Sequence, residues 1–159
     1  MFYFHLSEAQ LVLRQIFTAL ALSLCLAPLS ARAEVSIFSE RNGLALDGYD
    51  VVSFFEGQGA VEGRQEFALM WKGVVWRFVS SGNQARFEAN PRAYAPVFGG
   101  YCAYAMSQGY LAPGDPHLWR IDNGELFLLN NASVQVIWQE DAGALLQAAR
   151  GNWPAVLRD

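Results

Sequence analysis

The Asn123-Gly124 pair constrains the fold of this chain more than any other short segment. It stands between residues 119–121 and 126–129, two runs rich in apolar side chains. Both central residues of a type I′ turn need a positive φ, which Asn and Gly adopt at low cost. The sequence therefore predicts a β-hairpin over residues 119–129.

A second hairpin is predicted over residues 67–80, where two β-rich runs meet at Lys72-Gly73. Successive side chains of a strand point to opposite faces, so Trp76 and Phe78 share one face. The residues on the other face are Val75, Arg77 and Val79. One face of the predicted strand is therefore aromatic.

Short helices are predicted from the residues that begin and end them. Asp50 can cap a helix over residues 51–55, and a capped turn explains Asp47 and Asp50 without a cation site. The other predicted segments run from Ser80 or Ser81 to about Ala89, from Tyr101 to Gln108 before Gly109, and from Asn131 or Ser133, renewed at Asp141, to Gly151 and Pro154. Two hairpins interleaved with short helices predict a small single α+β domain.

The first 33 residues have the pattern of a cleavable signal peptide. A polar lead-in ends at Arg14, an apolar run covers residues 16–26, and small residues surround Ala33. The apolar run is shorter than the roughly 20 residues that span a bilayer. We expect residues 34–159 to form the mature domain, periplasmic or secreted, without a stable membrane span.

Cleavage after Ala33 makes the chain more acidic. The full chain has 11 basic and 15 acidic residues, and loss of Arg14, Arg32 and Glu8 leaves 9 and 14, a net charge of −5. A protein with a negative net charge and no run of basic residues is a poor partner for nucleic acid. The sequence therefore argues against a nucleic-acid-binding function.

Cleavage also leaves one cysteine, Cys102, because Cys25 lies within the predicted signal peptide. An exported domain with one cysteine forms no internal disulfide, so its core must stabilise it. A domain of this length buries about two-thirds of its unfolded surface, which is sufficient. His117 is likewise the one histidine left, since His5 is removed.

A series of short motifs covers nearly all of residues 44–154. In order, they are Leu46-Asp47-Gly48-Tyr49-Asp50, Trp71-Lys72-Gly73-Val74-Val75-Trp76-Arg77-Phe78, Arg86-Phe87-Glu88-Ala89-Asn90-Pro91-Arg92-Ala93-Tyr94, Gly99-Gly100-Tyr101-Cys102-Ala103-Tyr104-Ala105, Ala112-Pro113-Gly114-Asp115-Pro116 and Asn152-Trp153-Pro154. The series resembles the YHS domain. In its longer form it is similar to exported bacterial proteins described as YHS domain-containing (seleno)proteins.

The resemblance implies a metal-binding domain, with copper as the candidate metal. Similar modules of copper-transporting ATPases commonly carry cysteine after the phenylalanine that matches Phe78 and again in the next helix. This chain has Val79 and no cysteine over residues 81–89, so that thiolate site is absent. The seleno members imply that Cys102 occupies a redox position.

Cys102 is therefore the candidate site residue, with two interpretations of its thiol. It follows Gly99-Gly100 and lies in the first turn of the helix predicted over residues 101–108, where free backbone N–H groups favour a thiolate. The alternative is a buried cysteine that packs as a small hydrophobe. Met106, four residues on, would share its helical face and offer copper(I) a second soft ligand, or else belong to the core. His117 is a further candidate ligand, or a solvated surface imidazole in a turn.

These interpretations leave three alternative functions. The first is a non-enzymatic module that binds a soft metal or responds to thiol redox state through Cys102, with a protein partner or a metal donor. The second is a structural or partner-binding module with an inert buried cysteine. The third is a thiol-dependent oxidoreductase, which would need a resolving thiol from a partner.

Overall fold

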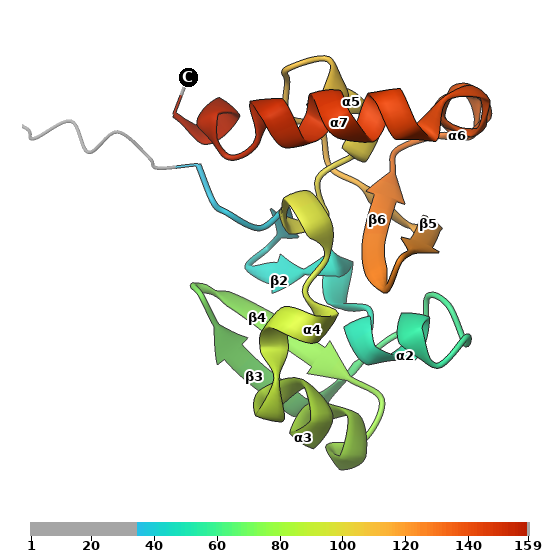
Figure 1. The fold of residues 1–159 in the computed structure, drawn as a ribbon. Coiled ribbons are helices and arrows are strands. Elements are labelled where there is room, and N and C mark those ends of the chain that lie inside the picture. Colours follow the sequence, from blue (N-terminus) through green and yellow to red (C-terminus); the bar gives the residue numbers. More distant parts are fainter. Residues whose placement is uncertain (1–34, 159) are drawn as a thin grey trace, which may run out of the picture. The chain divides into compact units, whose positions relative to one another are not determined.

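The computed structural model describes residues 35–158, so the predicted signal peptide lies outside the described residues. Within residues 35–158 the chain forms an α+β domain with two sheets (Figure 1). None of the helices in this range is both long and apolar enough to cross a membrane.

The larger sheet has four strands in the order β1-β2-β4-β3, and the smaller sheet pairs β5 with β6. The bounds of the strands are β1 Glu40–Arg41, β2 Leu44–Ala45, β3 Arg64–Trp71, β4 Val74–Phe78, β5 Asp115–Asp122 and β6 Glu125–Leu129. Both predicted hairpins are confirmed, with Trp71 opposite Val74 and Asp122 opposite Glu125. The strands β1 and β2 are two residues each, too short for an alternating pattern to reveal them.

The four predicted helical segments all form, the last of them as two helices, and four further short helices were not predicted. The bounds of the helices are η1 Leu46–Gly48, α2 Val51–Phe55, α3 Ser81–Ala89, α4 Pro91–Tyr94, η2 Val97–Gly100, α5 Ala103–Ser107, α6 Ala132–Glu140, α7 Ala142–Asn152 and η3 Ala155–Leu157. The caps act through the side chains of Asp50, Ser80, Asn131 and Asp141. The prediction of a helix over residues 101–108 was too long, and Gly151 lies inside α7 rather than ending it.

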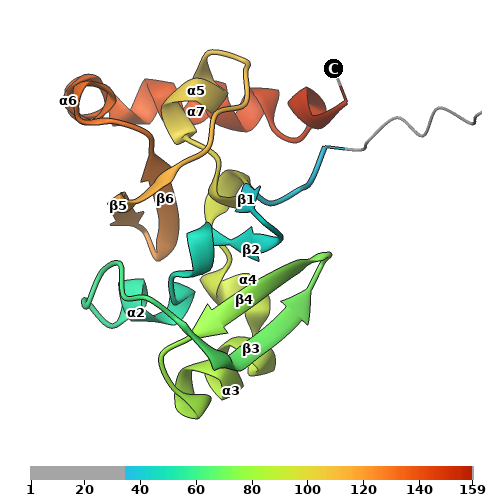
Figure 2. The same ribbon diagram turned by 180° about the vertical axis from the view of Figure 1, so that it is seen from behind.

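Two hydrophobic clusters form the core of the domain. The first is aromatic and gathers side chains of α2, β4 and α3, among them Phe54, Trp76 and Phe87. The predicted aromatic face of β4 is confirmed, because Trp76 and Phe78 are both buried there. The second cluster lies where α5 packs along α7, side by side in both ribbon views (Figures 1 and 2).

Candidate functional site

Cys102 lies in the second core cluster and has no exposed surface (0%). It is the N-cap residue of α5, and not a residue of its first turn as the sequence predicts. Its backbone N–H donates to the carbonyl of Ala112 at 2.8 Å, and a parallel bridge pairs it with Leu128. The thiol therefore belongs to a packed interior.

Met106 and His117 are placed differently from one another. Met106 is also 0% exposed, in the same cluster as Cys102, and its N–H donates to the carbonyl of Cys102 at 3.0 Å. His117 is exposed on β5, and its Nε2 lies 3.1 Å from the hydroxyl of Tyr49. The rings of Tyr49 and His117 meet edge to face, with centroids 5.1 Å apart. The structure brings Cys102 and Met106 together and pairs His117 with a tyrosine.

These residues do not fit a closed copper site. Within residues 35–158, no group of three or more His, Cys, Asp or Glu side chains is placed to hold a metal ion. A thiolate site for copper or zinc needs more soft ligands than one thiol and one thioether supply. Metal binding at Cys102 therefore stays a prediction from the resemblance.

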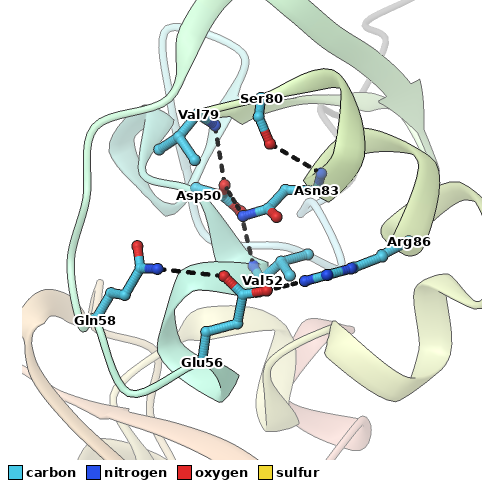
Figure 3. Close-up of polar contacts among 8 residues, drawn as sticks. All are labelled: Asp50, Val52, Glu56, Gln58, Val79, Ser80, Asn83 and Arg86. Atoms are coloured by element: carbon cyan, nitrogen blue, oxygen red, sulfur yellow. Dashed lines mark hydrogen bonds and ion pairs between the residues drawn. The ribbon is translucent and has the colours of Figure 1, made fainter.

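The carboxylate of Asp50 is a buried structural group rather than a cation ligand. It is 0% exposed and accepts hydrogen bonds from Val52 N at 2.8 Å, Val79 N at 2.9 Å and Asn83 Nδ2 at 2.7 Å (Figure 3). The first bond is the predicted cap. The other two join α2 to the end of β4 and to α3. This network fixes the aromatic core, and a neighbouring ion pair between Glu56 and Arg86 reinforces the same junction.

An open groove lies elsewhere on the domain, beside the start of the described chain. Figures 1 and 2 both place that start between the C-terminal η3 and the tip of the β3–β4 hairpin. One cavity there, of about 440 Å³, is lined by Val35, Leu157 and Arg158. A second cavity, of about 350 Å³, is lined by Trp71, Arg92, Phe98, Arg150 and Trp153. Both cavities share Ile37 and Lys72, so we treat them as one cationic groove.

Residues 35–38 form one wall of the groove, and packing and a hydrogen bond hold this segment against the rest of the domain. Phe38 is buried against Trp71 and Trp76, with ring centroids 5.4 and 5.1 Å apart. Ser39 N donates to the carbonyl of Gly99 at 2.9 Å. Gly99 has φ +64, and an added Cβ would lie 1.9 Å from the carbonyl oxygen of Ile37. Only glycine permits this approach of η2 to the N-terminal segment.

Lys72 stands at the junction of the two cavities because of the hairpin turn. Lys72 and Gly73 have φ values of +49 and +84, as the tight turn between β3 and β4 requires. The Lys72 ammonium lies 4.9 Å from the ring centroid of Trp71, a cation–π contact that restricts where the charge sits. The turn and the indole together hold the positive charge over the groove.

The groove is electropositive although the domain is acidic. Residues 35–158 include nine basic and twelve acidic side chains. Four of the nine basic residues line the groove, and none of the acidic residues within 35–158 does: Lys72, Arg92, Arg150 and Arg158. Arg150 pairs with Glu125 at 2.6 Å, whereas the other three form no ion pair with any carboxylate in this range. Sequence analysis missed this group because its members are scattered over 87 positions.

Comparison of the chain with protein-family models, with curated proteins and with solved structures found no match. The resemblance to YHS domains therefore rests on the motifs of the sequence and stays a prediction. The α+β class rests on the structure itself.

Proposed function

We propose that this chain is an exported, YHS-like, non-enzymatic binding module in which Cys102 is a structural residue and the cationic groove is the binding surface. One observation carries the proposal: the only thiol of the described residues has no exposed surface, while the groove is open and lined by charged and aromatic side chains. Thiol catalysis and thiol sensing both need a sulfur that a reactant can reach.

The surroundings of Cys102 favour a packing role over an activated thiolate. Helix α5 has five residues, and the N–H of Cys102 itself is already bonded to Ala112. Cys102 belongs to the second cluster, whose other buried members are apolar side chains such as Phe98 and Leu129. A small apolar residue serves such a position as well as cysteine does.

Site-specific thiol labelling tests this proposal. The folded full-length protein is treated with iodoacetamide, and the tryptic peptide of residues 93–120 is weighed, which separates Cys102 from Cys25. We expect modification of Cys102 only after unfolding in guanidinium chloride. A Ser133→Cys variant provides the matched control, because Ser133 is exposed on α6 and a thiol there must react in the folded state. Labelling of Cys102 as fast as the control would refute the structural role.

The same samples address the soft-metal function, which Cys102 and Met106 support only as a buried pair. Copper(I) titration of the wild type and of Cys102→Ala should give the same binding curve. A stoichiometric copper site that Cys102→Ala abolishes would favour the metal-binding module instead.

A further inference from the structure

Resting on the proposed function, we infer that the ligand of the cationic groove is an acidic peptide segment of a partner protein, extended in conformation and alternating acidic with large apolar side chains. The juxtaposition that carries this inference is three cations, Lys72, Arg92 and Arg158, that form no ion pair with any carboxylate of residues 35–158. They are spread along two adjoining cavities whose remaining walls include tryptophan and aliphatic side chains.

The distribution of charge selects an extended ligand over a compact one. Lys72 is shared by both cavities, Arg92 lines only one of them, and Arg158 lines only the other. A single phosphate or carboxylate would engage one end and leave the other cation without a partner. Several carboxylates along a chain engage all three, because each contributes a separate charge-assisted contact.

The apolar walls select a peptide with large side chains between its carboxylates. Val35 and Ile37 are 44% and 40% exposed, which is high for aliphatic residues, and both line the groove. Trp153, which is half-buried, lines its other end and packs against the buried Phe98, with ring centroids 6.0 Å apart. Burial of such surface by a ligand gains free energy in proportion to the apolar area covered.

The acidic surface outside the groove favours a short peptide over a nucleic acid as the ligand. Outside the groove, residues 35–158 hold five basic and twelve acidic side chains. A polyphosphate longer than the groove would meet this acidic surface and be repelled. A short acidic peptide touches the groove alone, so the local field attracts it without that penalty.

A charge-matched pair of variants tests the inference on the full-length protein. The probe is a fluorescein-labelled octapeptide, Glu-Leu-Glu-Phe-Glu-Leu-Glu-Phe, and binding is followed by fluorescence anisotropy at low ionic strength. Its neutral counterpart carries glutamine in place of glutamate. The groove variant is Lys72→Glu with Arg92→Glu, and the control is Arg41→Glu with Arg64→Glu, exposed cations that do not line the groove. Circular dichroism and the Tm of each variant establish that it is folded.

We expect the groove variant to weaken binding of the acidic octapeptide by about tenfold or more, since each reversal replaces an attraction with a repulsion. The control should change the Kd by less than about twofold, although its net charge is the same. Added salt should weaken binding to the wild type. Equal losses in both variants would overturn the inference, as would a single-stranded oligothymidylate that binds more tightly than the peptide.

The neutral octapeptide separates failure of this inference from failure of the proposed function. If the glutamine peptide binds the groove as tightly as the glutamate peptide, the binding module stands and the acidic class is wrong. If neither peptide binds the folded protein, the acidic-peptide inference and the groove as a binding surface are both wrong. The labelling of Cys102 is independent of either outcome.

Discussion

Replacing Asp50 by alanine removes an acceptor that three donors share, so it should be among the most damaging single changes in this domain. Loss of the cap at Val52 N costs about 1 kcal/mol. The Val79 N–H and the Asn83 amide lose a buried acceptor, at about 1–3 kcal/mol each. Val79 is half-buried, so water can bond to its N–H, and the cost of losing this acceptor lies near the lower end of that range. We expect Asp50→Ala to lower the free energy of unfolding by about 3–5 kcal/mol.

Urea unfolding followed by tryptophan fluorescence measures this loss, and several tryptophans lie in or against the two core clusters. The midpoint should fall while the m-value stays unchanged, because the same surface is exposed on unfolding. Glu88→Ala is the matched control: it removes an exposed carboxylate from α3, the helix that holds Asn83, and should cost less than about 0.5 kcal/mol. A loss for Asp50→Ala below about 1 kcal/mol would contradict the role given to the network.

Two further changes probe the segment beside the groove. The hydroxyl of Tyr101 donates to the carbonyl of Ser36 at 2.8 Å, so Tyr101→Phe should cost about 1 kcal/mol at neutral pH in thermal unfolding. Burial, and then the charge of Glu40, raise the pKa of Tyr101 above its usual 10.0. Tyr101 therefore ionises at a lower pH in the unfolded state than in the folded state, and the stability of the wild type should fall above about pH 10 relative to that of Tyr101→Phe. A stability difference between the two proteins that does not change with pH would contradict this. Gly99→Ala should lower the Tm more than Gly124→Ala does. Both glycines have positive φ, but an added Cβ would clash with Ile37 at Gly99 and meets nothing within 4 Å at Gly124. Equal losses of Tm would show that the contact between Gly99 and Ile37 does not require glycine.

The parts of the fold that could be predicted from the sequence depend on residues close together in the chain. The turn at Asn123-Gly124 needs only the φ preference of two adjacent residues. The cap at Asp50 reaches Val52, two positions away. The same carboxylate also reaches Val79 and Asn83, about thirty positions away, and no local pattern reveals that. A cap was therefore predictable, and the network around it was not.

The candidate site shows the same limit. The sequence made Cys102 the candidate site residue but left its burial open, because burial depends on distant contacts such as those with Ala112 and Leu128. Helix α5 begins at Ala103 rather than at Tyr101, and the N–H of Cys102 bonds to Ala112, ten positions away. The groove was not predicted at all. Its cations are far apart in the sequence, and only the placement of the carboxylates shows that three of the four form no ion pair within residues 35–158.

The glycine pair Gly99-Gly100 lies in the chain between the groove and the buried Cys102. In the sequence, Gly99-Gly100 suggested free N–H groups that would activate the thiol. In the structure, both glycines have positive φ, and Gly99 is in addition required by a close approach. Gly99 permits contact with Ile37, a residue that lines the groove, and a Cβ on Gly100 would lie 3.4 Å from side chains of Leu46 and Pro96. Backbone conformation at both positions, and packing at Gly99, therefore account for the two glycines without reference to the thiol. The segment from Gly99 to Cys102 shapes the groove at one end and enters the core at the other, so a change that loosens Cys102 should also disturb the groove.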